Sequence, residues 1–297
     1  MRSTCVLPLL AACALALKMC AQNHRFLKFH KLRSCFKSTL PILSWKQFDN
    51  VRDCMQFTRD KNGLAFNFSP PELQKARSCE VLGCPEVHNS TTFVFDPSYD
   101  YYSAYGDFNC GATANATCLR SVGLFQVVQE KMNYSSAARR CQDLGGDLAD
   151  ILTEARTNAL AALLKSLPNW YKGAYVGLDD ITVEGSFETP MGDFLQCSRF
   201  RAWAVGHPRP GRRKEDCVML DVEKTWRALN CKIKLDFICE FYPTPPDNTL
   251  NEFKYQNCSL VKSKKKKQEC ETNNELFELY NSSTRIDQCA LMNDFEF

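Results

Sequence analysis

The segment between Phe194 and Lys214 contains no acidic residue but several cationic ones. The side chains that could bind a ligand there are Arg199, Arg201, His207, Arg209, Arg212, Arg213 and Lys214. Arginine carries a permanent charge on a planar fork of donors that matches sulfate, phosphate or carboxylate. The segment therefore predicts a site for an anionic ligand: a sulfated or sialylated glycan, an acidic protein surface or a microbial polyanion. The alternative is a solvated basic loop that balances nearby carboxylates.

No catalytic constellation accompanies these residues. The chain lacks a Gly-x-Ser-x-Gly elbow, a His-Glu-x-x-His zinc motif and a glycine-rich phosphate loop. The other histidines are His24, His30 and His88, and no nucleophile is evident for His207 to activate. We predict a binding protein with no enzymatic activity, whose partner is a protein or an anionic glycan and not nucleic acid.

The first residues indicate a secreted protein. The apolar run from Cys5 to Leu17 is too short for a spanning helix, which needs about 20 residues, but it suits a signal-peptide core. Cleavage after Ala16 or after Ala21 fits the small residues there. We favour a signal peptide of residues 1–21, because it leaves 14 of the 17 cysteines, an even number that can pair completely. No later segment is apolar enough to span a membrane.

The cysteines predict disulfides rather than a metal site. Zinc prefers close Cys-x-x-Cys or Cys/His groupings, and the nearest pair in the mature chain, Cys79 and Cys84, is spaced more widely. Asn-x-Ser/Thr sequons agree with the secretory route. They are Asn67, Asn89, Asn115, Asn133, Asn257 and Asn281.

Residues 24–105 are expected to form a separate α+β unit. Ser44 and Gln47 have the spacing of a capping box, which predicts a helix that begins near Ser44 and contains Cys54. Strands are predicted over 64–68 and 78–82, and Tyr101-Tyr102 is expected to close the sheet.

The residues from Lys131 to Phe241 follow an order that chance would rarely produce. They include Tyr134, Ala137-Ala138, Cys141, Gly145-Gly146-Asp147-Leu148-Ala149, Tyr175-Val176-Gly177-Leu178, Glu184-Gly185, Trp203, Glu215-Asp216-Cys217, Trp226, Cys231 and Phe237-Ile238-Cys239-Glu240. This order closely resembles a C-type-lectin-like domain, over residues 123–242. The resemblance implies an α+β fold with two helices, small antiparallel sheets and a long loop stapled by disulfides.

The resemblance implies the disulfides Cys141–Cys239 and Cys217–Cys231. The chain-entropy model gives about 4.7 and about 3 kcal/mol for loops of their lengths. Local patterns agree with two helices: Gly145-Gly146 provides a stop for the first, and Thr153 can cap the second. The second helix has an apolar stripe, expected to be core, of Leu160, Leu163, Leu164 and Leu167.

This sequence departs from the family's sugar-binding pattern. The family holds calcium with Glu-Pro-Asn or Gln-Pro-Asp in the long loop and with an Asn-Asp pair after the strand tryptophan. Here His207-Pro208-Arg209 and Trp226-Arg227-Ala228 stand at those positions. Only Glu215 remains, and one carboxylate cannot satisfy an ion that takes six to eight oxygens. We predict that the calcium-dependent sugar site is lost.

The family's second, structural calcium site is partly kept. Matched by position, its carboxylates here are Asp180, Glu184, Glu215 and Asp216, while Pro210 replaces another. Gathered without a cation, these groups would repel one another and raise their pKa values. The positive charge is either calcium or the arginines of the basic segment.

The N-terminal region resembles a divergent PAN/apple module, on the helix-turn-strand order with Cys54, Ala65-Phe66-Asn67 and Cys79-Glu80-Val81-Leu82. That resemblance implies a Cys54–Cys79 disulfide. The family's second helix-to-strand bond is absent, since Thr58 and Gly63 stand at its positions. Cys35–Cys84 is a plausible further bond.

The remaining segments are a connector and a tail. Cys110 and Cys118 flank a short Gly/Ala/Thr/Asn stretch, which predicts a stapled loop over 106–122. Residues 243–297 combine a proline linker, which is stiff, with a basic and acidic tail. Cys197 and the tail cysteines lack obvious partners, so they could pair with each other or link chains into a disulfide-bonded extracellular assembly. A third possibility is a lectin that binds sugar by a non-standard site.

Overall fold

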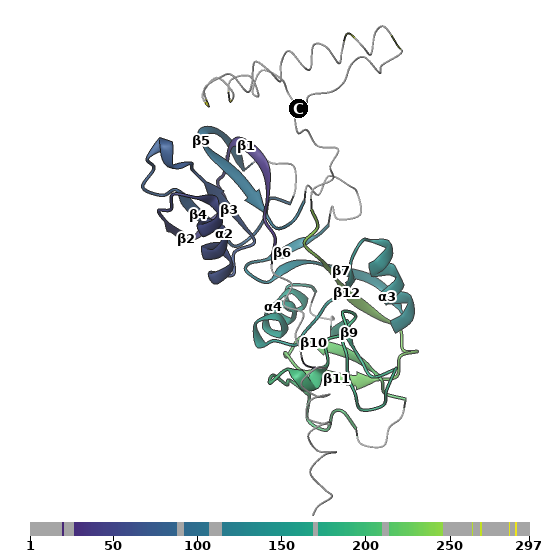
Figure 1. Cartoon of the computed structure of the whole chain (residues 1–297). Coiled ribbons are helices and arrows are strands. Elements are labelled where there is room, and N and C mark those ends of the chain that lie inside the picture. The colour runs from purple at the N-terminus through teal and green to yellow at the C-terminus, as the bar shows by residue number, and fades with distance from the viewer. Residues whose placement is uncertain are drawn as a thin grey trace, which may run out of the picture. The chain divides into compact units, whose positions relative to one another are not determined.

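The structure, a computed structural model, describes residues 20, 27–87, 92–106, 115–168, 172–209, 214–245, 263, 268, 285 and 289. The chain divides into two compact units (Figure 1). The central unit consists of Met1–Phe26 and Asn109–Tyr242. The N-terminal unit consists of Leu27–Phe108 and also contains Pro243–Phe297, so the tail belongs with the first half of the chain.

The N-terminal unit is a five-stranded antiparallel sheet with one α-helix. The strand order is β1-β5-β3-β4-β2. The elements are β1 (His30–Ser38), β2 (Ile42–Lys46), α2 (Val51–Asp60), β3 (Ala65–Phe68), the 3-10 turn η1 (Pro71–Leu73), β4 (Cys79–Leu82) and β5 (Phe93–Ser103). The helix α2 packs beside β3 and β4 (Figure 1), and the predicted Cys54–Cys79 disulfide joins it to β4.

The helix of this unit begins later than the capping-box spacing predicts. Ser44 lies in strand β2, and the N-cap is Asn50, whose side chain accepts a hydrogen bond from the backbone of Asp53 at 2.9 Å. The prediction of a helix start near Ser44 is therefore wrong, because pairing with β4 takes up the backbone of residues 42–46. The strands predicted over 64–68 and 78–82 are present. The PAN/apple assignment itself stays a prediction.

Two further predictions for this unit are wrong. Cys35 bonds to Cys289 in the tail and not to Cys84, which is itself disulfide-bonded. Asn67 is not a glycosylation site, because its side chain is fully buried. Its amide nitrogen donates to the Ser38 carbonyl and to Glu80, and its oxygen accepts from the Ser38 backbone.

The outcome for the other sequons follows their exposure. Asn115 is exposed and Asn133 is half-buried as the N-cap of the next helix, so both stay candidates. Asn89, Asn257 and Asn281 lie outside the described residues.

The central unit is a mixed sheet flanked by two α-helices (Figure 1). The strand order is β11-β10-β9-β12-β7-β6, β8 also pairs with β12, and the one parallel contact among the described strands joins β12 to β9. The elements are β6 (Thr117–Leu119), β7 (Gly123–Met132), α3 (Tyr134–Asp143), β8 (Asp147–Leu148), α4 (Glu154–Lys165), β9 (Gly173–Asp179), η2 (Leu195–Cys197), β10 (Cys217–Asp221), β11 (Trp226–Leu229) and β12 (Leu235–Phe241).

The helices of the central unit have the predicted ends and core. The side chain of Thr153 caps α4, and Gly145 follows α3 with φ +85°, a left-handed conformation that favours glycine. Leu160 and Leu164 are fully buried in the core between α4 and the sheet, and Leu163 and Leu167 pack at its margin. The disulfides Cys141–Cys239 and Cys217–Cys231 are both present.

The disulfide partner of Cys197 bears on the predicted cleavage site of the signal peptide. Cys197 bonds to Cys20, which cleavage after Ala21 would remove. Residues 1–19 lie outside the described residues. The bond is compatible with the alternative cleavage after Ala16 but not with cleavage after Ala21, and removal of a signal peptide itself stays a prediction. In this structure Cys197 and Cys289 both bond within the chain, and an oligomer linked through cysteines stays a prediction. Cys118 is disulfide-bonded, while Cys110 lies outside the described residues, so their pairing stays a prediction.

No helix in the described part of the chain combines the length and hydropathy that a membrane crossing requires.

Candidate functional site

The long loop between β9 and β10 is held at three places. Leu195 is buried and its backbone N–H donates to Phe187 at 2.8 Å. Cys197 is tied to Cys20, and the hydroxyl of Ser198 donates to the Leu152 carbonyl at 2.8 Å. These contacts bind the start of the basic segment to the core of the unit.

The strand β11 holds the second part of the loop. Trp226 is fully buried, and its backbone exchanges hydrogen bonds with the loop: its N–H donates to Ala202 at 2.8 Å and its carbonyl accepts from Ala204 at 2.9 Å. The ring of Trp203 packs on Trp226 and on Phe187. The loop is therefore held in place up to Ala204. After it, Val205, Gly206, Pro208 and Arg209 are exposed, whereas His207 is half-buried.

The predicted ligand-binding residues have different surroundings. Arg199, Arg209 and Lys214 are exposed. Arg201 folds back, since its guanidinium donates to the carbonyls of Ser198 and Phe200 at 2.7 and 2.6 Å. Arg212 and Arg213 lie outside the described residues.

The charges of Arg209 and Arg227 both act on His207, and these three residues are called the cationic cluster below. Burial, followed by the charges of those two arginines, lowers the pKa of His207, so the imidazole is neutral at physiological pH. Its ring hydrogen-bonds the Ala228 backbone, and its Nδ1 atom is buried with no hydrogen-bond partner among the described residues. The His207–Pro208 peptide bond is cis.

Each arginine of this cluster is anchored by one carboxylate. The Nη1 atom of Arg209 lies 3.3 Å from Glu215, and the Nε atom of Arg227 lies 2.9 Å from Asp221. Burial opposes ionisation of Asp221, but hydrogen bonds from Thr225 and Arg227 hold its pKa below the usual value. Both arginine side chains are about half exposed, at 49% each. Their remaining N–H groups can therefore meet a ligand.

Arg227 was not among the predicted ligand-binding residues. The signal was present in the sequence, because Arg227 follows the strand tryptophan that the family pattern marks. Its position is set by pairing of β11 with β10, where Arg227 lies opposite Met219, and that register is not evident from local sequence.

The four carboxylates of the expected calcium site are only partly gathered. Asp180 is buried and its Oδ2 atom accepts from the Gly185 N–H at 2.8 Å. Burial, with repulsion from Asp216 and Glu184, raises the pKa of Asp180 to about 6. One oxygen of Asp180 and one of Glu215 are buried without a hydrogen-bond partner among the described residues.

These carboxylates do not form a metal site in the described part of the chain. No three His, Cys, Asp or Glu side chains there are arranged to hold an ion. Glu215 is neutralised by Arg209, and calcium needs six to eight oxygen ligands. The described carboxylates alone therefore do not complete a calcium shell, and calcium at this position stays a prediction.

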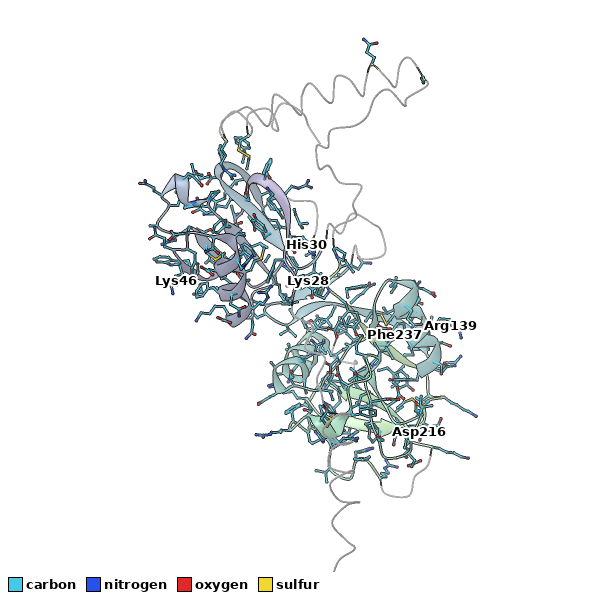
Figure 2. The ribbon with its side chains drawn as sticks, viewed as in Figure 1. Lys28, His30, Lys46, Arg139, Asp216 and Phe237 are labelled. Atoms are coloured by element: carbon cyan, nitrogen blue, oxygen red, sulfur yellow. A yellow bond between two sulfur atoms is a disulfide. The ribbon has the colours of Figure 1, made fainter. Side chains whose placement is uncertain are left out.

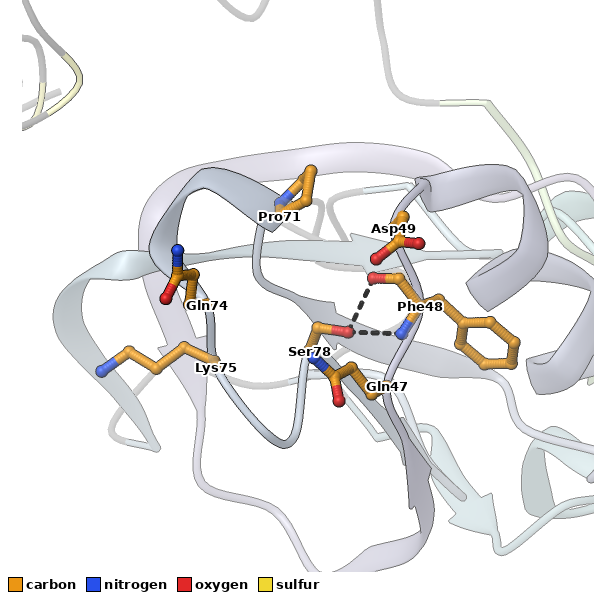
Figure 3. Close-up of a pocket in the computed structure, with 7 residues that line it drawn as sticks. All are labelled: Gln47, Phe48, Asp49, Pro71, Gln74, Lys75 and Ser78. Atoms are coloured by element: carbon orange, nitrogen blue, oxygen red, sulfur yellow. Dashed lines mark hydrogen bonds between the residues drawn. The ribbon is translucent and has the colours of Figure 1, made fainter.

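The N-terminal unit has a pocket of about 390 Å³ (Figure 3). The hydroxyl of Ser78 ties its wall together, accepting from the Phe48 N–H and donating to the Phe48 carbonyl, and the Phe48 ring points away. The other polar side chains that line it, Gln47, Asp49, Gln74 and Lys75, are exposed. Because water competes for all of them, the pocket defines no ligand class.

The fold and disulfides of the central unit define a class: an extracellular-type α+β domain with a long loop secured by cysteines. Residues 130–241 match the lectin C-type domain model, and they form a C-type lectin domain. Such domains are generally non-enzymatic.

Curated relatives agree with this class. Collectin-10 of Gallus gallus is 35% identical over 117 residues, covering 39% of this chain and 41% of the relative. Lithostathine-2 of Mus musculus is 27% identical over 192 residues, covering 63% of this chain and 92% of the relative. This chain spans about two-fifths of the length of the collectins that it matches. These relationships and the disulfides indicate an extracellular protein.

Among solved structures, human lithostathine at 1.3 Å resolution aligns with a TM-score of 0.39 and 21% identity. The alignment covers 43% of this chain and 88% of that structure.

Proposed function

We propose that the protein is a secreted, calcium-independent recognition protein that binds an anionic glycan at His207, Arg209 and Arg227. The observation that carries this proposal is the cationic cluster itself. Two half-exposed guanidiniums lie close enough to His207 for their charge to lower its pKa. A carboxylate or sulfate group there would accept charge-assisted hydrogen bonds from both arginines.

An acidic protein surface is the alternative ligand, because the exposed N–H groups of Arg209 and Arg227 suit either anion. The unpaired acceptors beside them, Nδ1 of His207 and one oxygen of Glu215, are buried, so they do not distinguish the two ligands. Heparin, a sulfated glycan, tests the choice of a glycan.

The proposal is tested by retention on heparin resin. We expect retention that falls as salt rises, because screening weakens exposed charge pairs, and that does not change when EDTA is added. The double variant Arg209→Gln/Arg227→Gln should bind at least roughly tenfold more weakly, since hydrogen bonds to charged groups contribute roughly 1.5–3 kcal/mol each. Reversing Arg209, Arg212 and Arg213 together should abolish retention.

The matched control removes the same charge elsewhere. Arg139 is exposed on α3 and lies apart from Asp216 in Figure 2. Its neighbour Arg140 makes a long ion pair, 3.9 Å to Glu130. Arg139→Gln/Arg140→Gln should bind heparin almost as the parent does. Equal losses in both double variants would show that retention depends on net charge, and the proposed site would be rejected.

Retention on mannose or galactose resin that EDTA reverses would also reject the proposed function, because such retention would show that a bound metal completes the site.

A further inference from the structure

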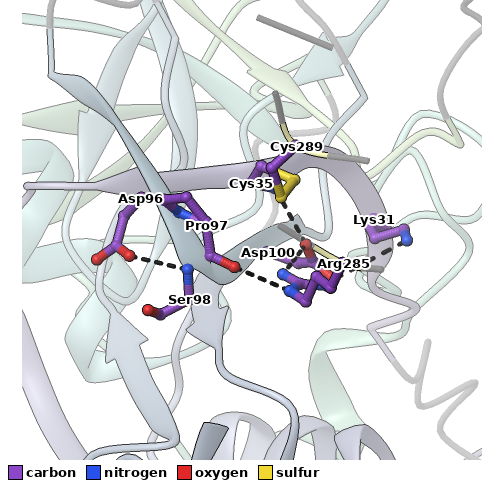
Figure 4. Close-up of a disulfide and its surroundings, with 8 residues drawn as sticks. All are labelled: Lys31, Cys35, Asp96, Pro97, Ser98, Asp100, Arg285 and Cys289. Atoms are coloured by element: carbon purple, nitrogen blue, oxygen red, sulfur yellow. Dashed lines mark hydrogen bonds and ion pairs between the residues drawn. A yellow bond between two sulfur atoms is a disulfide. The ribbon is translucent and has the colours of Figure 1, made fainter. Parts of the chain in front are cut away.

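A tail residue, Arg285, lies in a site formed by strands β1 and β5 of the N-terminal unit (Figure 4). Its Nη2 atom donates to Oδ1 of Asp100 at 2.7 Å, and its Nη1 atom lies 3.4 Å from the other carboxylate oxygen. Its Nε atom donates to the Pro97 carbonyl at 2.8 Å. One guanidinium therefore makes a forked contact with a carboxylate and a further bond to the backbone.

The site results from an irregularity in the sheet. Ser34 pairs with Asp100 and Phe36 with Phe95, so residues 96–99 bulge out of β5 opposite Cys35. The side chain of Asp96 accepts from the Ser98 N–H at 2.9 Å, which stabilises the turn. The bulge turns the Pro97 carbonyl toward Arg285, as Figure 4 shows. Bulges commonly redirect groups in this way.

Asp100 needs a cation. It is only 4% exposed, and a buried carboxylate without a partner is strongly destabilising. The Cys35 backbone N–H donates to Asp100 at 3.1 Å. Lys31 is the other cation nearby, at 3.9 Å, with half of its side chain in solvent. Arg285 supplies the short contacts, although it lies far along the chain from the strands that it contacts.

The same site holds a disulfide. Cys289, four residues after Arg285, bonds to Cys35, which is itself 2% exposed. Arg285 and Cys289 are each in helical conformation, and they contact strands β5 and β1 of this unit, respectively. The sequence separation of the two cysteines is 254, so closeness along the chain does not select this pair among the 17 cysteines.

We propose that the β1–β5 bulge is an arginine-binding site whose ligand is Arg285 of the same chain, and that this contact positions Cys289 to bond with Cys35. Arg285 is a positioning residue for oxidative folding. It holds the tail while the thiols of Cys35 and Cys289 lose two protons and two electrons to a small disulfide such as oxidised glutathione, which becomes two thiols. The bond then ties Cys289 covalently to strand β1.

The test is refolding of the full reduced chain in a glutathione buffer, with disulfides mapped by mass spectrometry of unreduced peptides. In Arg285→Ala we expect the fraction of Cys289 bonded to Cys35 to fall roughly tenfold, because the forked charge-assisted contact is lost. Arg285→Lys should give an intermediate yield, because lysine keeps the charge but not the fork. The control Arg52→Ala removes an exposed arginine on α2 of the same unit and should leave the yield unchanged.

Two results would overturn the proposal. The first is a Cys35–Cys289 yield in Arg285→Ala equal to that of Arg52→Ala. The second is a Cys35–Cys289 bond found between chains when isotope-labelled and unlabelled protein are refolded together. Because Arg285→Ala removes the close cation from buried Asp100, the N-terminal unit must first be shown to fold. Recovery of Cys54–Cys79 in each variant verifies this before the Cys35–Cys289 yields are compared.

Discussion

The two units hold their folds by different means. The central unit has a continuous apolar core, in which α4, the sheet and the long loop meet around residues such as Leu160, Val218 and Trp226. In the N-terminal unit, one buried cluster joins Ala65, Leu82 and Tyr101, and Phe66 and Val81 are also fully buried. Around that cluster lie the disulfides of α2 and of the tail, and buried polar groups such as Glu80 and Asp100.

The difference also concerns arginines. In the N-terminal unit, the hydrogen bonds of Arg285 go to groups of the same unit, because a buried carboxylate and a backbone carbonyl accept from it. In the central unit, Arg209 and Arg227 each make one carboxylate contact and stay half exposed. The first arrangement holds a chain segment in place, and the second leaves donors for a ligand. The same residue type therefore has two roles, which its sequence context alone does not separate.

The largest expected effect comes from removing one disulfide in each unit. Cys54→Ala/Cys79→Ala should unfold the N-terminal unit, whereas Cys217→Ala/Cys231→Ala should leave the central unit folded. These bonds close loops with sequence separations of 25 and 14, worth about 3 kcal/mol each in the chain-entropy model. The outcomes differ because Cys54 and Cys79 are both fully buried, whereas Cys231 is only half-buried.

Hydrogen exchange, measured for each unit separately, checks this prediction. Loss of protection confined to residues 27–106 in the first variant is the expected result. Equal loss, or greater loss in the central unit, would contradict the proposed contrast between core and cross-links.

A smaller effect is expected from breaking a buried ion pair in the central unit. Glu240 is 7% exposed and accepts from the guanidinium of Arg156 and from the Asp150 N–H. Arg156→Met should lower the free energy of unfolding by about 3–5 kcal/mol, because it leaves a buried carboxylate without its cation. The control is Arg140→Met, which removes an exposed pair and should cost about 0–1 kcal/mol.

Chemical denaturation of the two variants measures both values. A cost below about 1 kcal/mol for Arg156→Met would mean that water reaches Glu240, and that the core of this unit is less closed than its burial indicates.

Local patterns predicted the central unit well. Caps and stops such as Thr153 and Gly145 depend on neighbouring residues, so they are evident in the sequence, and the family resemblance supplied the pairing of Cys141 with Cys239. The N-terminal helix was misplaced because the capping-box residues Ser44 and Gln47 satisfy a local rule, while pairing of β2 with β4 is a distant contact that overrides it.

The covalent links between distant segments were beyond sequence reasoning. The need for an even number of cysteines favoured cleavage after Ala21, which removes Cys20. In the structure, however, Cys20 forms the disulfide that holds Cys197 in the long loop. Cys289 was unassigned because the bulge that receives it forms only when β1 and β5 pair. At the candidate site, the basic loop was predicted, but the contribution of Arg227 depends on the register of β11.

The smallest expected effect is a pH-dependent one at Asp180. Burial, with repulsion from Asp216 and Glu184, raises its pKa to about 6, above an unfolded value of about 3.9. The folded chain therefore binds more protons than the unfolded chain between these values, and stability is lost as pH rises through 6. Asp180→Asn removes the charge but keeps an oxygen for the Gly185 N–H.

The Asp180→Asn variant should be more stable than the parent by about 1 kcal/mol at pH 7.5, after allowance for solvent screening, and equal to it at pH 4. Glu223→Gln, at an exposed position of the same unit, should show neither change. Thermal unfolding at both pH values, with and without calcium, measures this. If calcium stabilised the parent but not Asp180→Asn, the carboxylates would form an ion site after all, and the central unit would rely on a metal where we infer that Arg209 supplies the charge.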